Sequence, residues 1–154
     1  MMAVKQAGRA ALFLLRLLVG YGFMALGFAK LSRGADAFAS VLQHLGVPLP
    51  LFSAWLTIGT EILGGLAMFV GAFVVWASIP MAFVLLVAAA TVHFQYGFSS
   101  IRLLDVSPAG ARFGPVGYEI DLLYLAALLT LALAGPGALA IDNLRRRTAE
   151  PAES

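Results

Sequence analysis

The sequence has no cysteine among its 154 residues. This absence excludes thiol–disulfide exchange, a cysteine-ligated iron–sulfur cluster and a thiolate metal site within the chain itself. The two histidines, His44 and His93, are too few for a histidine-rich metal site. We therefore expect no metal and no resident cofactor in this chain.

Charged residues are also scarce, at 12% of the sequence, whereas hydrophobic residues make up 61%. A soluble domain has about 25% charged and about 45–50% apolar residues. A chain this short cannot bury so much apolar surface away from water, so the composition predicts an integral membrane protein in contact with lipid. The basic residues are spread over the ends and loops, which does not favour a nucleic-acid partner.

Four apolar segments are long enough to cross a bilayer, which takes roughly 20 residues. The predicted spans cover residues 11–31, 51–71, 73–96 and 118–139. We expect an all-α fold, a four-helix transmembrane bundle forming one domain over residues 11–142. Residues 1–10 and 143–154 are predicted tails, the second of them disordered. Basic residues in both tails favour placing both termini in the cytoplasm. They are Lys5, Arg9, Arg145, Arg146 and Arg147.

The two longer loops differ in pattern. Residues 32–50 carry an apolar stripe at helical spacing, which predicts a short amphipathic helix between the first and second spans. The stripe consists of Ala37, Phe38, Val41, Leu42 and Leu45. Such a helix either covers one end of the bundle or is a simple connector, and the sequence does not choose. Residues 97–117 mix Ser, Gly, Pro and Arg without a period, which predicts an irregular cap.

Ionisable residues inside membrane spans are rare and usually face the bundle interior. Glu61, in T-E-I-L-G-G, lies near the middle of the second span, and Arg16 lies within the first. If these spans are antiparallel, the long side chain of Arg16 can reach toward Glu61. We therefore predict an Arg16–Glu61 ion pair. The pair is open to two interpretations. It is either a structural ion pair that fixes the register between the two helices or part of a functional polar site.

A second cluster is expected at the opposite end, formed by Lys30, His93 and Glu119, with Asp121 as an optional fourth member. Glu119 and Asp121 are two positions apart, so they point about 200° from each other on a helix. We expect Glu119 to face inward and Asp121 to face another helix or a partner. Structural alternatives remain for each: snorkelling for Lys30, a hydrogen bond for His93, and stabilisation of a helix N-terminus for Glu119.

Glycines recur in the first two spans, where they predict close helix packing. They are Gly20, Gly22, Gly27, Gly59, Gly64 and Gly65.

The order of several short motifs carries a family resemblance. The motifs are L-L-R-L-L-V-G, G-F-A-K-L, L-G-V-P-L-P, T-E-I-L-G-G, a third span ending in His, G-Y-E and G-P-G-A-L-A-I-D. Over roughly residues 12–142 the chain resembles the DoxX family of small four-helix membrane proteins. That family is related to the small subunit of thiosulfate:quinone oxidoreductase.

The resemblance implies a role and a set of polar positions. The family's recurrent polar positions map onto Arg16, Lys30, Glu61, His93, Glu119 and Asp142. The implied protein is a bacterial-type, multi-pass inner-membrane accessory subunit of a quinone-linked oxidoreductase, working beside a soluble or membrane redox partner. The first five of these residues would bind the quinone substrate, and Glu61, His93 and Glu119 would exchange its protons.

Two other functions stay open at this point. The chain could be a non-enzymatic membrane scaffold or assembly factor, or a carrier of a lipid or small apolar ligand. Whether it is an enzyme, and whether it forms a homo-oligomer, does not follow from the sequence.

Overall fold

The computed structural model describes residues 2–144. The elements in chain order are α1 (Met2–Arg33), α2 (Ala35–His44), α3 (Pro50–Gly59), the π-helical turn η1 (Thr60–Gly64), α4 (Gly65–Val70), α5 (Val74–Ala88), the π-helical turn η2 (Ala89–His93), the 3₁₀ turn η3 (Phe94–Tyr96), the strands β1 (Leu103–Ser107) and β2 (Gly110–Phe113), and α6 (Glu119–Ala134). Because η1 joins α3 to α4 and η2 joins α5 to η3 directly, each series forms one continuous helical rod.

Three helical segments within this part of the chain are long and apolar enough to cross a membrane: Gln6–Arg33, Pro50–Val70 and Val74–Tyr96. They correspond to the first three predicted spans. The first helix begins at Met2, nine residues before the predicted start of the span. The fourth predicted span contains α6, which has 16 residues. The predicted disordered tail lies largely in residues 145–154, outside the described residues.

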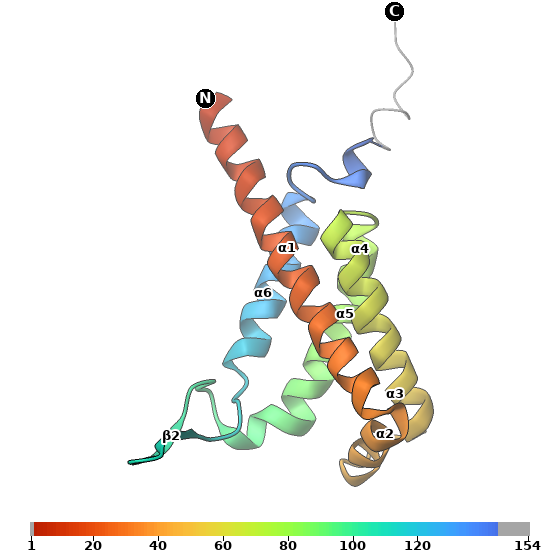
Figure 1. The fold of residues 1–154 in the computed structure, drawn as a ribbon. Coiled ribbons are helices and arrows are strands. Elements are labelled where there is room, and N and C mark those ends of the chain that lie inside the picture. The colour runs from red at the N-terminus through yellow and green to blue at the C-terminus, as the bar shows by residue number, and fades with distance from the viewer. Residues whose placement is uncertain (1, 145–154) are drawn as a thin grey trace, which may run out of the picture.

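The long helices run between two ends of the molecule (Figure 1). The terminal end holds the start of α1, the turn between α4 and α5, and the segment that follows α6. The hairpin end holds α2 and the β1–β2 hairpin, which projects sideways from the bundle (Figure 1). α1 lies across the α3–α4 rod (Figure 1).

Glycines allow the close approach of α1 to the α3–α4 rod. A Cβ on Gly20 would lie 2.7 Å from the carbonyl oxygen of Gly65, and one on Gly65 would lie 2.8 Å from that of Gly20. A Cβ on Gly27 would lie 3.0 Å from the Cβ of Glu61. The predicted packing role is thus confirmed at these positions. At Gly59 a Cβ would meet nothing within 4 Å.

The apolar core joins α1, α4, α5 and α6. Its buried members are Val19, Phe23, Met68, Val74, Met81, Leu85, Leu128 and Leu131. Many other large apolar side chains on the same helices are exposed, among them Leu18, Trp76 and Leu133. A helix that is apolar all round suits a lipid environment, because lipid solvates the outward side chains.

The predicted amphipathic helix is confirmed as α2. Its buried residues Ala39 and Leu42 form a second core cluster with Ala54 of α3. Val41, a member of the predicted stripe, is instead exposed, so the packed face is rotated toward Ala35 and Ala39.

The predicted irregular cap over residues 97–117 is wrong, because this loop contains an antiparallel hairpin. The strands meet at a two-residue turn, with Ser107 paired to Gly110, whose φ of 121° suits glycine. Apolar and polar residues alternate on both sides of the turn, and the Ser, Pro and Gly content of the loop obscured that signal.

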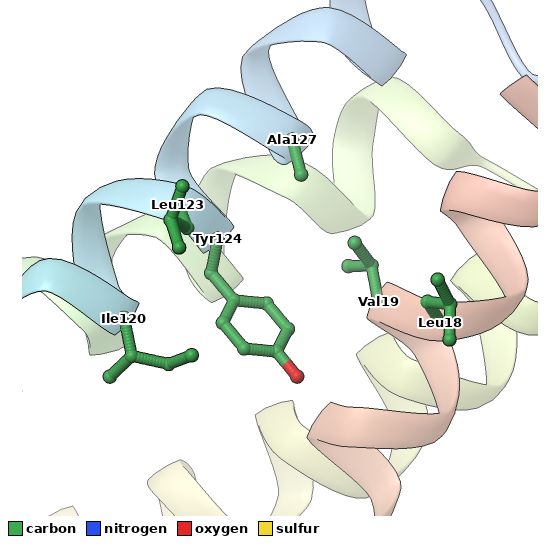
Figure 2. Close-up of a pocket in the computed structure, with 6 residues that line it drawn as sticks. All are labelled: Leu18, Val19, Ile120, Leu123, Tyr124 and Ala127. Atoms are coloured by element: carbon green, nitrogen blue, oxygen red, sulfur yellow. The ribbon is translucent and has the colours of Figure 1, made fainter. Parts of the chain in front are cut away.

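A shallow apolar groove runs between α1 and α6 (Figure 2). It has a volume of about 150 Å³ and is lined by Leu18, Val19, Ile120, Leu123, Tyr124 and Ala127. Typical small-molecule pockets have volumes of about 300–1,000 Å³. The groove can therefore hold only part of a lipid-like molecule.

Candidate functional site

Glu61 lies in the π-helical turn η1 and pairs with Lys30 of α1. The Lys30 Nζ donates to both carboxylate oxygens, at 2.7 Å from Oε1 and 2.8 Å from Oε2. The carboxylate side chain is 4% exposed and the lysine side chain 25% exposed. The ammonium also lies 5.4 Å from the ring centroid of Phe38 in α2. A buried carboxylate is thus joined to a partly accessible cation beneath the amphipathic helix.

The predicted Arg16–Glu61 pair is wrong, because the two residues lie at different levels. Glu61 lies opposite Gly27 of α1, eleven residues beyond Arg16. At a rise of 1.5 Å per residue this is an axial offset of about 16 Å, which is beyond the reach of a guanidinium. At the level of Arg16 the rod instead presents Gly71, where a Cβ would meet the guanidinium.

Arg16 instead holds the segment that follows α6. Its Nη1 donates to the carbonyl of Pro136 at 3.1 Å, and its Nη2 donates to the carbonyl of Leu139 at 3.2 Å. The residue is 1% exposed and stacks over the ring of Phe13 at 5.4 Å. Its bonds to backbone carbonyls indicate a structural role at the terminal end.

Asp142 is bound at the same end and caps α5. Its Oδ1 accepts from the backbone N–H of Phe73 at 2.8 Å, and its Oδ2 accepts from that of Val74 at 3.0 Å. The backbone N–H of Asp142 itself donates to the carbonyl of Gly71 at 2.9 Å. These bonds satisfy helix N-terminal donors that a membrane helix cannot leave unpaired.

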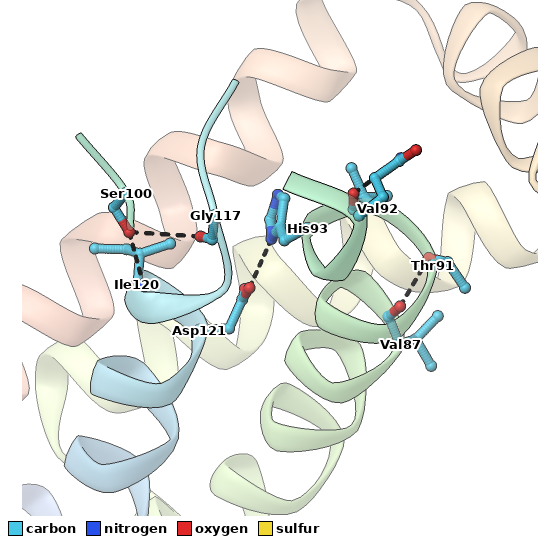
Figure 3. Close-up of polar contacts among 9 residues, drawn as sticks. Val87, Thr91, Val92, His93, Ser100, Gly117, Ile120 and Asp121 are labelled. Carbon is cyan, nitrogen blue, oxygen red and sulfur yellow. Dashed lines mark hydrogen bonds and ion pairs between the residues drawn. The ribbon is translucent and has the colours of Figure 1, made fainter. Parts of the chain in front are cut away.

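His93 and Asp121 form the second polar pair of the hairpin end (Figure 3). The His93 Nδ1 lies 2.6 Å from Oδ2 of Asp121. His93 ends the π-helical turn η2, and Asp121 lies in the first turn of α6. The histidine side chain is 25% exposed and the carboxylate 3% exposed. As at Glu61, a buried acid is joined to a partly accessible base.

The prediction that Glu119 faces inward is wrong, since Asp121 occupies the buried position. Glu119 accepts a hydrogen bond from the backbone N–H of Ser100 at 2.9 Å. Ser100 in turn accepts at its Oγ from the backbone N–H of Ile120, as Figure 3 shows. Glu119 therefore ties the base of the hairpin to the start of α6. The prediction that Asp121 faces another helix is confirmed.

The five residues predicted to bind one ligand thus fall into four separate sets of contacts. Lys30 pairs with Glu61 and His93 with Asp121 at the hairpin end, Glu119 binds the hairpin base, and Arg16 lies at the terminal end. Asp121 is the polar residue that the prediction left outside the site. The two-residue spacing from Glu119 showed that only one carboxylate could face inward, but it did not determine which.

Both candidate pairs involve a π-helical turn. A π turn is rare, appears mostly as a single turn within an α-helix, and is frequent at functional sites. Glu61 lies within η1 and His93 within η2. Among the described residues no group of three or more His, Asp or Glu side chains is arranged to hold a metal ion. The arrangement is suited to hydrogen bonding and proton exchange with a polar group at either pair.

Comparisons with known proteins agree with the motif order. The family model described as DoxX matches residues 11–94, just over half of the chain. The chain is also similar to inner membrane protein YphA of Escherichia coli (strain K12), at 26% identity over 140 residues, which is 89% of this chain and 92% of that protein. No solved structure is significantly similar to this chain.

Proposed function

This chain is a member of the DoxX family of integral membrane proteins, and on that premise we propose that it is a quinone-linked redox accessory subunit of a bacterial inner membrane. The observation that carries the proposal is the His93–Asp121 pair, a partly exposed imidazole held at 2.6 Å by a buried carboxylate. The similarity to an Escherichia coli protein named for its inner-membrane location supports the placement.

The proposed topology has four spans, with α6 as the fourth. Its 16 residues extend about 24 Å, against a hydrocarbon thickness of about 30 Å, so the residues that flank α6 would complete the crossing. α6 contacts α1 through Phe23 and Tyr124, whose rings meet edge to face at 5.6 Å. Its exposed Leu123, Leu129 and Leu133 would face lipid. With four spans both termini lie on one side, and the basic tails favour the cytoplasm.

Quinone reduction consumes two electrons and two protons and yields a quinol. An ionised Asp121 only accepts hydrogen bonds, so the Nδ1 of His93 carries the proton of their contact. The Nε2 of His93 is then the atom that exchanges a proton with a quinone oxygen, while Asp121 stabilises the imidazolium that forms. His93 therefore acts as the proton donor in quinone reduction and the acceptor in quinol oxidation.

The Lys30–Glu61 pair supplies the same kind of chemistry at a second position. Lys30 presents N–H donors and Glu61 presents a buried carboxylate that can take up a proton. In the proposal it accompanies the histidine pair as a second proton-exchanging group. Arg16, Glu119 and Asp142 are left out of the ligand site, because backbone groups bind all three.

The electrons would come from a partner protein carrying a flavin, haem or iron–sulfur centre. The groove between α1 and α6 would seat part of the isoprenoid tail, since Ile120 and Tyr124 of its lining neighbour Asp121 on α6. The ring would then lie toward the polar pair.

Ligand binding by the purified full chain in lipid nanodiscs tests this proposal. Native mass spectrometry should detect a copurified quinone, and a short-chain benzoquinone analogue should bind in a titration. We expect His93→Ala and Asp121→Asn each to weaken binding by about tenfold or more, as expected from losing one charge-assisted hydrogen bond.

Thr91→Val is the matched control, since Thr91 lies in the same π turn and its hydroxyl bonds to the carbonyl of Val87 at 2.7 Å. It should bind the analogue like the unmodified protein. Absence of quinone binding by the unmodified protein, or equal binding by all variants, would overturn the proposal.

One observation favours a second candidate, a non-enzymatic scaffold. Each ion pair joins two different helices, Lys30–Glu61 linking α1 to η1 and His93–Asp121 linking η2 to α6. In that function Glu61→Gln lowers the unfolding temperature while no small molecule copurifies. A copurified phospholipid or apolar ligand would instead identify a carrier.

A further inference from the structure

The β1–β2 hairpin has one apolar and one polar face. Asp105 pairs with Arg112 across the strands, and the next pair is Val106 with Ala111. Since neighbouring residues of a strand point to opposite faces, these two pairs lie on opposite sides of the ribbon. Phe113 shares the side of Ala111 by the same alternation.

A β-bulge extends the apolar face. The register shifts between Leu103 and Asp105, so that Leu103 pairs with Phe113. The extra residue, Leu104, packs beside Gly114. Without the bulge Leu103 would point with Asp105 to the polar side. The apolar face therefore consists of Leu103, Val106, Ala111 and Phe113.

This apolar face is not covered by the rest of the described chain. Leu103 is 55% exposed, Val106 69% and Phe113 61%, and Ala111 is exposed as well. A two-stranded ribbon is marginally stable by itself in water. An uncovered apolar face on such a ribbon therefore indicates contact with something apolar outside this chain.

The hairpin is joined by two short segments to the rod of α5, η2 and η3 and to the start of α6. Only residues 97–102 separate η3 from β1, and only residues 114–118 separate β2 from α6. The base is closed by backbone bonds from Gly114 to Arg102 at 2.8 Å and from Gly117 to Ser99 at 3.1 Å. The hairpin projects sideways from the bundle and not along the helices (Figure 1).

An aromatic cluster centred on Tyr118 lies at this base. The ring of Tyr118 stacks on that of Phe94 at 5.6 Å and meets that of Phe98 edge to face at 5.5 Å. Tyrosine is enriched at the ends of membrane spans, where its amphipathic ring lies at the level of the lipid headgroups, so Tyr118 favours this level for the base. Phe94 and Phe98, which lie between α5 and the hairpin in the chain, are exposed apolar residues as well.

We propose that the hairpin is a membrane-surface anchor whose apolar face lies in the boundary between phospholipid headgroups and acyl chains. The polar face, with Asp105 and Arg112, points to water. Deeper insertion is excluded, because the outer edges of a two-stranded ribbon need water or headgroups as hydrogen-bond partners. Arg102 and Arg112 have side chains long enough to reach phosphate oxygens, which fits a phospholipid surface.

Single-cysteine spin labelling tests the proposal directly, because the natural chain has no cysteine. Val106→Cys and Phe113→Cys place the label on the apolar face, and Ser107→Cys and Arg112→Cys place it on the polar face. The full chain is reconstituted in phosphatidylcholine nanodiscs with and without phosphatidylglycerol. Accessibility to oxygen, which concentrates in lipid, and to a water-soluble nickel chelate is then measured for each label.

We expect the labels at Val106 and Phe113 to be accessible to oxygen and protected from nickel, and those at Ser107 and Arg112 to show the reverse. Leu133→Cys, on an exposed position of α6, provides the lipid reference. Equal nickel accessibility on both faces would overturn the anchor. Protection of the apolar-face labels from both reagents would overturn it too, in favour of a protein contact. Neither result depends on whether the chain binds quinone.

Discussion

Buried charge is handled differently at the two ends of the bundle. At the terminal end Arg16 is 1% exposed and donates to two backbone carbonyls, and Asp142 accepts from two backbone amides. At the hairpin end each buried carboxylate is bound by one partly exposed base, Glu61 by Lys30 and Asp121 by His93. Backbone partners cannot be exchanged without moving the chain, whereas a lysine or histidine at the surface can bind a ligand. On the proposed function, the terminal end has a structural role and the hairpin end holds the residues that exchange protons.

The largest effect is expected from Lys30→Met, which leaves Glu61 buried without its counter-charge. Removing one partner of a buried pair costs about 3–5 kcal/mol of unfolding free energy. The double variant Lys30→Met/Glu61→Leu should recover most of this loss, because an apolar pair of similar volume is often neutral. Denaturant titration in detergent measures both. A cost under about 1 kcal/mol for the single variant would mean that the pair behaves as a solvated one.

Arg16→Met should cost about 3 kcal/mol, because two charge-assisted hydrogen bonds are lost and two carbonyls lose their donor. Arg16→Lys keeps the charge but not the planar fork, so it should recover only part of the stability. The same titration applies. Binding of the benzoquinone analogue should stay unchanged in Arg16→Met, and loss of binding in a stably folded variant would break the division between the ends.

Gly20→Ala tests the crossing of α1 over α4, which lies between the two ends of the bundle. The added Cβ would meet backbone atoms of Gly65 and Phe69 at 2.7 Å, so the helices must separate, at a cost of about 1–3 kcal/mol. Gly59→Ala is the matched control, since its Cβ would meet nothing within 4 Å, and alanine should raise helix stability by up to about 1 kcal/mol. Equal unfolding temperatures for the two variants would count against the crossing.

The smallest effect is expected from Asp142→Asn, at about 1 kcal/mol. The amide keeps one acceptor oxygen and loses both the charge and the second acceptor. Hydrogen exchange of the backbone amides of Phe73 and Val74 should therefore accelerate, while exchange at the hairpin end stays the same. Uniform acceleration across α5 would show that Asp142 supports more than the cap.

The sequence predicted those elements of the fold in which contact with lipid or with a neighbouring helix leaves a pattern over many residues. Three spans, the amphipathic α2 and the glycine contacts of Gly20 and Gly65 follow from composition and spacing, because each depends on a local pattern. The hairpin was missed although Asp105–Phe113 alternates polar and apolar residues around a turn. The hairpin has only four paired positions, and the surrounding Gly, Pro and Ser residues hide such a short alternating pattern.

The pairing of the charges could not be predicted, because it depends on how far one helix extends past another. Arg16 and Lys30 both lie on α1, and the choice between them for Glu61 is set by the axial level at which the α3–α4 rod crosses α1, with Glu61 opposite Gly27. Likewise the choice of Asp121 over Glu119 is set by the rotation of α6 against α5. Neither the axial offset nor the rotation leaves a periodic signal in the sequence.

The π-helical turn η1 also affects the direction in which the α3–α4 rod presents its side chains. A π turn contains more residues than the 3.6 of an α turn, which offsets the phase of all later residues by about 100° per extra residue. The half before it packs Ala54 against α2, and the half after it packs Gly65 against α1. A one-residue deletion in Thr60–Gly64 would shorten the rod by about 1.5 Å yet turn one half away from its neighbour. The residue count of Thr60–Gly64 therefore determines which side chains residues 50–59 and 65–70 present to α2 and α1, and not only the length of the rod.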